Sequence, residues 1–548
     1  MSLLDDARAW IAQDPDPVTR SELEALVALT EAGDESAAAD LAARFSGRLA
    51  FGTAGLRGEL GAGPMRMNRV LVGQAAAGLG AYLLGREEHP SVIIGYDGRH
   101  NSAVFARDSA AILAGAGVEA ILLPRALPTP VLAFAVRELR ASAGVMVTAS
   151  HNPARDNGYK VYLGGGDEGA QIVPPADGDI AAEIERASLV AFGDRPTSPH
   201  VTIADESLVD AYVARTAALA HDPAPLRVVY TPMHGVGLEV ATRVLAEAGF
   251  PAPLVVEAQA APDPDFPTVA FPNPEEPGTM DLAFALARES DAELVIANDP
   301  DADRVAVGVP DASADGGWRR LSGNEIGWLL GWRAARTHSE GTLACSLVSS
   351  PALREIARVH GLRFAETLTG FKWISRAPGL VYGYEEALGY LVDPQKVRDK
   401  DGISAAVAVL TLFSELRAAG ESLDEHLDRF ALEFGAYASA QISIRVADLS
   451  VIPATIARLR ATPPTEVGGF SVEGIDDFTV GVDDFPPSDI LRLRLAGGGR
   501  VIVRPSGTEP KLKCYLDASS RDGSASERRA AAAAAVAALE AGMRELLA

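Results

Sequence analysis

The segment Gly144 to Tyr162, GVMVTASHNPARDNGYKVY, places three chemically useful side chains close together: Ser150, His151 and Lys160. The apolar run VMV stops abruptly at small and polar residues, so we expect a buried strand that ends at Ser150. In open α/β sheets, ligands bind at the carboxyl ends of the strands. Ser150 is therefore a candidate nucleophile. Taken alone, a serine and an asparagine before a proline favour a turn or a helix cap over a nucleophile.

Three aspartates alternate in the segment NDPDADR, which directly follows the apolar strand LVIA. An extended loop would point Asp299, Asp301 and Asp303 to one side. Such close like charges repel and favour a divalent cation; ligation by oxygen alone suits Mg²⁺, with Ca²⁺ or Mn²⁺ as alternatives. The segment is not an EF-hand loop, because arginine and proline stand where that loop needs glycine and glutamate. The alternative is a solvated acidic turn.

Two segments have the composition of phosphate-binding loops. RPSGTEPKLK follows the apolar strand VIV and offers donors around a tight turn, namely Arg504, Ser506, Gly507 and Thr508. Side chains and backbone amides of this kind can hold a phosphate dianion. FGTAGLRGELGAGPMRMN combines glycines with Arg57 and could also contact a phosphate. A plain hairpin turn remains the alternative for the first segment.

A further segment, YGYEEALGY, places Glu385 and Glu386 on a loop flanked by glycines, where carboxylates could accept hydrogen bonds from sugar hydroxyls. An exposed acidic turn is the alternative.

Lysine usage draws attention to the same regions. Only six of the 49 basic residues are lysine. They lie in four short segments of the sequence, which contain Lys160, Lys372, the pair Lys396 and Lys400, and the pair Lys511 and Lys513. Lysine acts as a compact charge for phosphate or as an acid or base, whereas arginine does not deprotonate.

Composition and missing motifs exclude other classes. A net charge of −25 disfavours nucleic acids and anionic membranes as partners. No apolar run approaches the ~18 residues of a membrane span, and the acidic amino terminus is unlike a signal peptide. Two distant cysteines exclude a disulfide framework and a cysteine zinc site. The P-loop and the nucleophile elbow of α/β-hydrolases are absent, and HGVGLEV lacks the third glycine of a dinucleotide-binding fingerprint. We therefore expect a cytoplasmic protein.

The elements that must position these groups repeat along the chain. Segments 91–123, 226–257 and 342–369 each run from an apolar strand through a turn and an Ala/Leu helix into a second strand. This βαβ pattern predicts three related α/β domains with mixed sheets, after a helical segment 1–51. Strands followed by an alanine-rich helix predict a smaller α+β domain at the end. The expected boundaries are 1–200, 201–317, 318–434 and 435–548, with the domains arranged around a central cleft.

In combination, the motifs resemble those of the α-D-phosphohexomutase superfamily, which includes phosphoglucomutases and phosphomannomutases. TASHNP resembles its phosphoserine loop, DPDADR its magnesium loop, GYEEALGY its sugar loop and RPSGTEPK its phosphate loop, in the same order. The resemblance extends over nearly the whole chain. FGTAGLRG, FPNPEEPG, TLTGFKW and VRDKDG are most similar to the long-chain branch that includes phosphoglucomutases with phosphopentomutase activity.

The resemblance implies a role for each candidate residue. Ser150 would carry the transferable phosphoryl group and would bind Mg²⁺ together with Asp299, Asp301 and Asp303. Lys160 and His151 would be acid/base or electrostatic groups, and either could be the general base. Arg57 and Arg304 would orient the phosphoryl group. The expected contacts to sugar or phosphate come from Lys372, Glu385, Glu386, Lys400, Arg504, Ser506, Gly507 and Thr508.

The implied activity moves a phosphoryl group between the 1-position and the 6- or 5-position of an aldose phosphate, through a sugar bisphosphate that also serves as activator, such as glucose 1,6-bisphosphate. The last domain would hold the other phosphate and move on a hinge. Glucose phosphates are the first expectation and mannose or pentose phosphates the alternative, because Ala387 replaces a serine of many relatives. A sugar-1,6-bisphosphate synthase and a sugar-phosphate sensor are the competing interpretations. The resemblance is compatible with a monomer or a homodimer.

Overall fold

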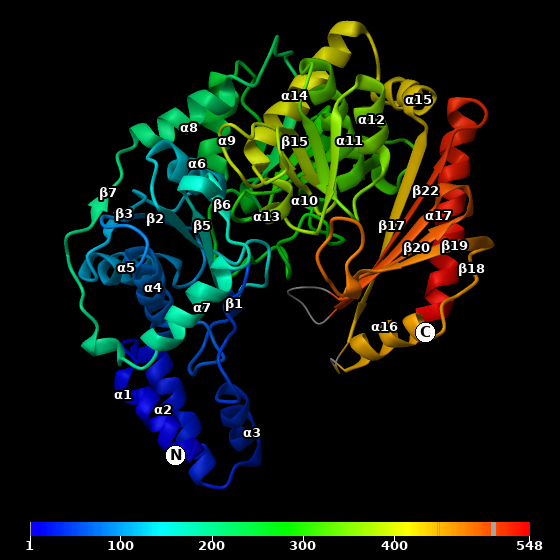
Figure 1. The fold of residues 1–548 in the computed structure, drawn as a ribbon. Coiled ribbons are helices and arrows are strands. Elements are labelled where there is room, and N and C mark those ends of the chain that lie inside the picture. Colours follow the sequence, from blue (N-terminus) through cyan, green and yellow to red (C-terminus); the bar gives the residue numbers. More distant parts are fainter. Residues whose placement is uncertain (1, 447, 449, 506–510, 548) are drawn as a thin grey trace. The chain divides into compact units, whose positions relative to one another are not determined.

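The computed structural model describes residues 2–446, 448, 450–505 and 511–547 (Figure 1). The chain divides into two compact units. The first comprises Met1–Leu321 and Ala387–Thr411, and the second comprises Ser322–Glu386 and Leu412–Ala548. Within the described residues, the strands form four main sheets, three with flanking helices in α/β arrangement and a last antiparallel one.

Three helices form the amino-terminal segment, as the sequence predicts: α1 (Leu3–Gln13), α2 (Pro17–Glu31) and α3 (Glu35–Arg44). Ser2 and Asp5 form a capping box at the start of α1, and Asp16 caps α2, which has a proline at its first position. The apolar faces of the helices meet in a small core around Trp10 and Leu23, which also receives residues that follow α3. This core attaches the segment to the first domain.

Substitutions in α2 test this attachment. Leu23 is fully buried and Val18 is 73% exposed on the same helix. We expect Leu23→Ala to lower the free energy of unfolding by about 2–5 kcal/mol, because it removes buried methyl groups and leaves a cavity. Val18→Ala should change it by less than about 0.5 kcal/mol. Urea denaturation measures both, and equal midpoints would contradict the packing described here.

The first sheet has the order β1-β5-β4-β2-β3-β7, with β6 beside β5. Its strands are β1 (Leu56–Glu59), β2 (Ser91–Tyr96), β3 (Glu119–Leu122), β4 (Ala143–Val147), β5 (Asp156–Leu163), β6 (Ala170–Gln171) and β7 (Thr202–Ile203). Its helices are α4 (Arg69–Leu84), α5 (Ser102–Gly115), α6 (Thr129–Glu138) and α7 (Ala176–Ala187). β2 runs parallel to β3 and β4, whereas β5 runs antiparallel to β4, so the sheet is mixed. The carboxyl ends of β2 and β4 therefore lie at one edge.

The second sheet has the order β12-β11-β10-β8-β9. Its strands and helices are α8 (Ser207–Ala217), β8 (Val228–Thr231), α9 (Leu238–Glu247), β9 (Leu254–Val255), α10 (Asp281–Glu289), β10 (Leu294–Asn298), β11 (Val305–Pro310) and β12 (Trp318–Arg320). β10 is buried along its whole length, runs parallel to β8 and turns back into the antiparallel β11. The turn between β10 and β11 is the aspartate loop.

A segment from further along the chain, Ala387–Thr411, also belongs to the first unit. It contains β16 (Gly389–Leu391) and the start of α14 (Gly402–Ala419). The ammonium of Lys396 is buried there, 2.6 Å from Thr216 Oγ1 on α8 and 2.7 Å from Asp401 Oδ2. Lys396 is thus a structural cation that fixes this segment to α8, although its neighbourhood in the sequence suggested a functional site.

Among the described residues, one helix, α14, is long and apolar enough to cross a membrane by length and composition. Most of its length is buried, as in the core helix of a globular domain.

The second unit holds the third and fourth domains. The third has α11 (Gly323–Thr337), β13 (Thr342–Ser346), α12 (Ala352–His360), β14 (Arg363–Thr367), α13 (Phe371–Ile374) and β15 (Leu380–Glu385), followed later by α15 (Leu423–Phe434). β13 is parallel to both β14 and β15. All three predicted βαβ units are therefore present, as β2-α5-β3, β8-α9-β9 and β13-α12-β14.

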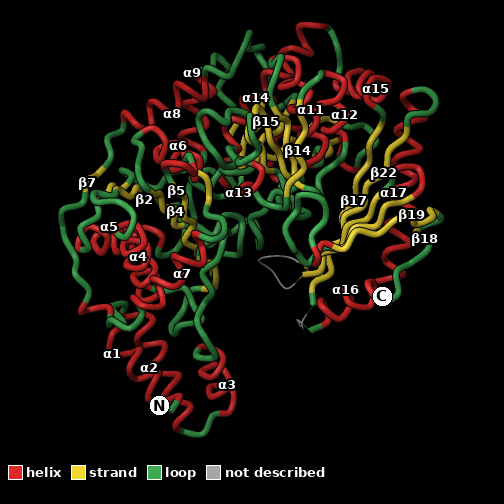
Figure 2. Tube along the Cα trace, viewed as in Figure 1, coloured by secondary structure: helices red, strands yellow, loops and turns green. Residues whose placement is uncertain are grey.

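The fourth sheet is antiparallel, with the order β17-β22-β21-β20-β19-β18. Its elements are β17 (Ala436–Arg445), α16 (Val451–Ala461), β18 (Glu466–Val467), β19 (Phe470–Asp477), β20 (Leu491–Leu495), β21 (Arg500–Pro505), β22 (Lys511–Ser520) and α17 (Ala525–Leu547). Figure 2 shows the long strands β17 and β22 side by side, with α17 along them. The predicted fold class is confirmed in its four-domain α/β architecture with mixed sheets; the exact boundaries and the central cleft stay predictions.

Candidate active site

The serine loop begins where β4 ends. The backbone of Ser150 is left-handed, with φ of 53°, and its amide donates to Thr148 Oγ1 at 2.8 Å. A non-glycine residue in this conformation is strained and marks a constrained position. Ser150 Oγ donates to Asp299 Oδ2 at 2.9 Å and lies 3.1 Å from His151 Nδ1. The hydroxyl is therefore directed at the aspartate loop of the neighbouring domain rather than used as a helix cap.

Arg99 holds the serine loop in this shape. Its guanidinium is buried and donates to four backbone carbonyls of the loop, those of Ser150, Asn152, Pro153 and Asp156, at 2.5 to 3.1 Å. Asp97 lies 3.5 Å away and balances the charge. Sequence reasoning missed this arginine. The available signal was YDGR, which places Asp97 and Arg99 just after β2, the strand beside β4.

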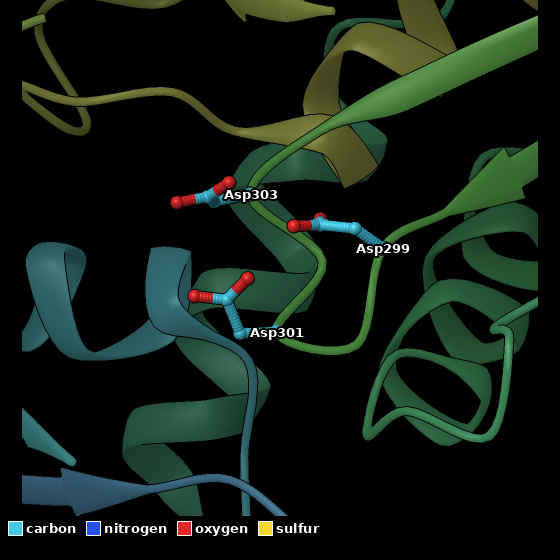
Figure 3. A group of neighbouring side chains, drawn as sticks. All are labelled: Asp299, Asp301 and Asp303. Atoms are coloured by element: carbon cyan, nitrogen blue, oxygen red, sulfur yellow. The ribbon is translucent and has the colours of Figure 1, made fainter. Parts of the chain in front are cut away.

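The three predicted metal ligands converge. Asp299, Asp301 and Asp303 are fully buried, and one carboxylate oxygen from each lies within 4.8 Å of the others (Figure 3). The backbone is not the extended loop that strict alternation suggested. Ala302 is left-handed, with φ of 54°, and its amide donates to the carbonyl of Asp299, so a tight turn brings the carboxylates together.

Neighbouring chain segments fix this turn. A side chain at Gly235 would lie 2.3 Å from the backbone of Pro300, and one at Gly402 would lie 2.2 Å from the carbonyl of Arg304. Both positions therefore require glycine. Thr129, at the start of α6, donates through Oγ1 to Asp301 Oδ2 at 2.6 Å and through its amide to the carbonyl of Asp301. Three other segments of the first unit, at Thr129, Gly235 and Gly402, therefore fix the aspartate loop.

The donor set fits a divalent cation. Oδ1 of Asp301 and Oδ1 of Asp303 are buried and accept no hydrogen bond from the part of the chain that the structure describes. Unpaired buried carboxylate oxygens are costly unless a cation is bound. Burial raises the pKa of Asp299 well above its ordinary value, and the charges of Asp301 and Asp303 raise it further. Oxygen donors of this kind suit Mg²⁺.

Four basic residues surround the carboxylates or the serine. Lys160 Nζ donates to Asp301 Oδ2 at 2.7 Å and to Asp303 Oδ2 at 2.9 Å. Burial lowers the pKa of Lys160, but these two carboxylates outweigh it and raise the pKa above its ordinary value. The Arg304 side chain lies 4.0 Å from Asp303 and 3.5 Å from Glu275, and its amide donates to Asp299 Oδ1.

The other two basic residues are Arg57 and Lys400. Arg57, on β1, donates to Asn152 Oδ1 at 3.2 Å and therefore borders the serine loop. Lys400 Nζ lies 3.3 Å from Asp303 Oδ2. This adds a second ammonium beside the carboxylate oxygen that Lys160 contacts. The expected contact of Lys400 with sugar or phosphate stays a prediction.

His151 is partly buried. Its ring meets Phe271 edge to face, with 6.0 Å between the ring centres. Burial lowers the pKa of His151 well below its ordinary value, and the positive charges of Arg304 and Arg57 lower it further. The imidazole is therefore neutral, with Nδ1 beside the serine hydroxyl.

The remaining predicted residues belong to the second unit. Glu385 ends β15, and Glu386 follows it and accepts hydrogen bonds from the hydroxyls of Ser346 and Ser349 at 3.1 and 3.0 Å. Lys372 lies in α13 and Arg504 in β21. Ser506, Gly507 and Thr508 fall outside the described residues.

Comparison with known proteins identifies the family. Models of the four phosphoglucomutase/phosphomannomutase domains match residues 48–191, 209–312, 322–432 and 444–535. The chain belongs to the phosphoglucomutase/phosphomannomutase family. Members of this family are isomerases that act as intramolecular phosphotransferases, so the protein is an enzyme of that type. The family is Mg²⁺-dependent, which agrees with a buried aspartate triad able to bind a metal.

The proteins that are similar to this chain are named after different sugar substrates. A protein named "probable phosphomannomutase" from Haemophilus influenzae is 55% identical over 84% of this chain and 94% of its own length. The phosphopentomutase of Homo sapiens is 35% identical over 93% and 90%, and a phosphoglucomutase of Staphylococcus aureus is 34% identical over 86% and 90%. A family protein from Burkholderia thailandensis shares the fold, with a TM-score of 0.68 at 20% identity over 91% of this chain and 96% of its own.

Substitution of Arg99 tests the serine loop. Arg99→Lys keeps a positive charge beside Asp97 but loses the planar guanidinium that donates hydrogen bonds to four carbonyls. We expect kcat to fall about 10- to 100-fold while metal binding is retained, because loss of loop geometry misplaces Ser150. Arg155→Lys is the matched control, since Arg155 lies in the same loop with its side chain 76% exposed. Equal activity of the two variants would contradict the role of Arg99.

Substitution of an aspartate tests the metal site. We expect Asp303→Asn to raise the dissociation constant for Mg²⁺ at least about tenfold, because it replaces a charged oxygen ligand by a neutral amide. Isothermal titration calorimetry, or Mn²⁺ binding followed by electron paramagnetic resonance, measures the change. Asp315→Asn, at an exposed acidic position in the same domain, is the control. Unchanged affinity in Asp303→Asn would rule out this triad as the metal site.

Proposed function

We propose that the protein is a phosphosugar mutase that moves a phosphoryl group between the 1-position and the 6- or 5-position of an aldose phosphate. Ser150 carries the group as phosphoserine. The observation that most supports this is the 2.9 Å hydrogen bond from Ser150 Oγ to Asp299, one of three buried carboxylates that form a cation site. A turn or cap serine has no reason to be directed at such a site.

In the proposed first transfer, a sugar hydroxyl attacks the phosphorus of phosphoserine. The bond from phosphorus to Ser150 Oγ breaks as the bond to the sugar oxygen forms, and the hydroxyl proton ends on the serine oxygen. His151 Nδ1, 3.1 Å from that oxygen, is the proposed group that passes the proton. The second transfer reverses these steps with the other phosphate of the resulting bisphosphate. A sugar bisphosphate, such as glucose 1,6-bisphosphate, would therefore restore phosphoserine and act as activator.

Asp299, Asp301 and Asp303, together with an oxygen on Ser150, are the proposed ligands of Mg²⁺. The ion would neutralise charge on the phosphoryl oxygens during transfer. Lys160 remains charged between two carboxylates and supplies a fixed positive charge beside the reacting group. Arg57 and Arg304 are proposed to orient the phosphoryl group, and Lys400, which lies beside Asp303, is proposed to contact the sugar or its phosphate.

The phosphate that does not react needs its own site. Arg504, with Ser506, Gly507 and Thr508 of the same segment, is the proposed site, and the sugar is proposed to bind Glu385, Glu386 and Lys372. Because either end of the bisphosphate must reach Ser150, this mechanism requires the intermediate to turn over between the two transfers. Hinge motion of the last domain and a cytoplasmic location stay predictions from the sequence.

Glucose 1-phosphate and glucose 6-phosphate are the first substrate pair that we propose. Mannose phosphates are the second candidate, favoured by the 55% identity to the protein named "probable phosphomannomutase". Pentose phosphates follow, because phosphopentomutases are similar over 93% of the chain. A panel of hexose and pentose 1-phosphates, assayed with catalytic bisphosphate, ranks the three. Net formation of bisphosphate from an acyl phosphate donor, without mutase turnover, would instead favour a bisphosphate synthase.

Removal of the serine hydroxyl tests the proposal directly. Ser150→Ala should lower kcat by at least about 1,000-fold, because the covalent route is lost. Binding of glucose 6-phosphate, measured by calorimetry, should change less than about threefold, since the sugar contacts are elsewhere. Ser313→Ala, in an exposed turn, is the control for removal of a hydroxyl. Full activity of Ser150→Ala would refute the mutase mechanism.

A further inference from the structure

Arg500, on β21 of the last domain, joins three partners with one guanidinium. Nε donates to Asp517 Oδ2 at 2.8 Å and Nη1 donates to Glu366 Oε1, on β14, at 3.2 Å. Nη2 donates to the backbone carbonyl of Ser349, in the loop after β13. The side chain is 11% exposed. All of these residues belong to the second unit, so Arg500 links the third and fourth domains within it.

Ser349 extends this link to the predicted sugar loop. Its hydroxyl donates to Glu386 Oε2 at 3.0 Å and accepts from the amide of Glu386 at 3.2 Å. Ser346 donates to the same carboxylate oxygen at 3.1 Å, and both serines are fully buried. Glu386 is therefore held through its side chain and its backbone. The residue before it, Glu385, is the last residue of β15.

An apolar contact supports the same connection. Leu347 and Val348, between the two serines, pack in one cluster with Phe478, Ile502 and Tyr515 of the last domain. The loop from Ser346 to Ser349 thus lies between the fourth sheet and the sugar loop. A shift of β21 would move this loop, and with it the two hydroxyls that hold Glu386.

We propose that Arg500 is a positioning residue for sugar recognition, acting through Ser349 on the loop that carries Glu385 and Glu386. The inference rests on the proposed function, because it assigns that loop to the sugar. Arg500 lies four residues before Arg504, the proposed phosphate contact, on the same strand. Arg500 thereby couples phosphate binding by the last domain to sugar recognition by the third domain. Only a planar guanidinium can reach all three partners, so lysine is not an equivalent.

The chain offers a matched control in Arg492. This arginine also lies near Glu366, with 3.5 Å between Nη1 and Oε2, and is 14% exposed. Its Nε donates to Asp476 at 2.8 Å, and no bond joins it to Ser349 among the residues that the structure describes. Arg492 shares the ionic environment of Arg500 but lacks the link to the sugar loop.

The experiment compares Arg500→Lys, Ser349→Ala and Arg492→Lys in the full-length enzyme. Calorimetry gives dissociation constants for a hexose 1-phosphate and a pentose 1-phosphate, and steady-state assays give kcat and KM. We expect the first two variants to weaken binding of the better sugar about tenfold, the effect of losing one well-placed hydrogen bond. The ratio of hexose to pentose affinity should change at least about fivefold. Arg492→Lys should leave that ratio within about twofold.

Ser349→Ala keeps the carbonyl that Arg500 contacts, so it reports on the link even if Arg500→Lys folds poorly. Thermal unfolding of all variants shows whether weaker binding arises from an unfolded protein or from displacement of Glu386 in a folded one. An unchanged sugar ratio in Ser349→Ala, or equal effects of Arg500→Lys and Arg492→Lys, would overturn the proposal. A wild-type enzyme that binds sugar phosphates without turnover would refute the proposed function, while the affinity ratios would still decide this inference. Absence of sugar-phosphate binding would overturn both.

Discussion

The aspartate loop imposes the constraint on which the first unit depends. Three carboxylates whose ligand oxygens lie within 4.8 Å of one another repel strongly when buried, and burial removes the water that would screen them. The fold compensates with positive charge: Lys160 bonds to Asp301 and Asp303, and Lys400 and Arg304 also approach Asp303. A protein with a net charge of −25 thus concentrates cations at one place. The serine hydroxyl is directed at that place, where we propose that a divalent ion and a phosphoryl group bind.

Much of this arrangement could be predicted from the sequence, because it is encoded in short contiguous patterns. Apolar strands that end abruptly in polar residues indicated both the serine loop and the aspartate loop, and strand alternation with Ala/Leu helices indicated the three βαβ units. These signals are local. They depend on how one strand ends or how one helix is followed by a glycine, and four such motifs in a fixed order identified the family before any contact was known. Both cysteines are free and buried, in agreement with the absence of a disulfide framework.

The rest depends on contacts between distant segments, which no local pattern encodes. Arg99 is more than 50 residues from the carbonyls it holds, and its four partners are backbone atoms with no sequence signature. Lys400 approaches Asp303 only because the segment after residue 386 returns to the first unit. Lys396 shared a motif with Lys400 yet is a structural cation. The chain forms a tight turn at Ala302 instead of the expected extended loop. This turn brings the three carboxylates together, and the alternation of aspartates in the sequence does not predict it.

Transfer of labelled phosphate to the enzyme tests the central claim, that Ser150 carries the phosphoryl group beside the aspartate site. The enzyme is mixed with ³²P-labelled glucose 1,6-bisphosphate and Mg²⁺, quenched and digested, and the labelled peptide is identified by mass spectrometry. We predict stoichiometric label on the peptide that contains Ser150, dependent on Mg²⁺ and removed by excess unlabelled glucose 6-phosphate. Continued turnover with no label on Ser150 would contradict the account.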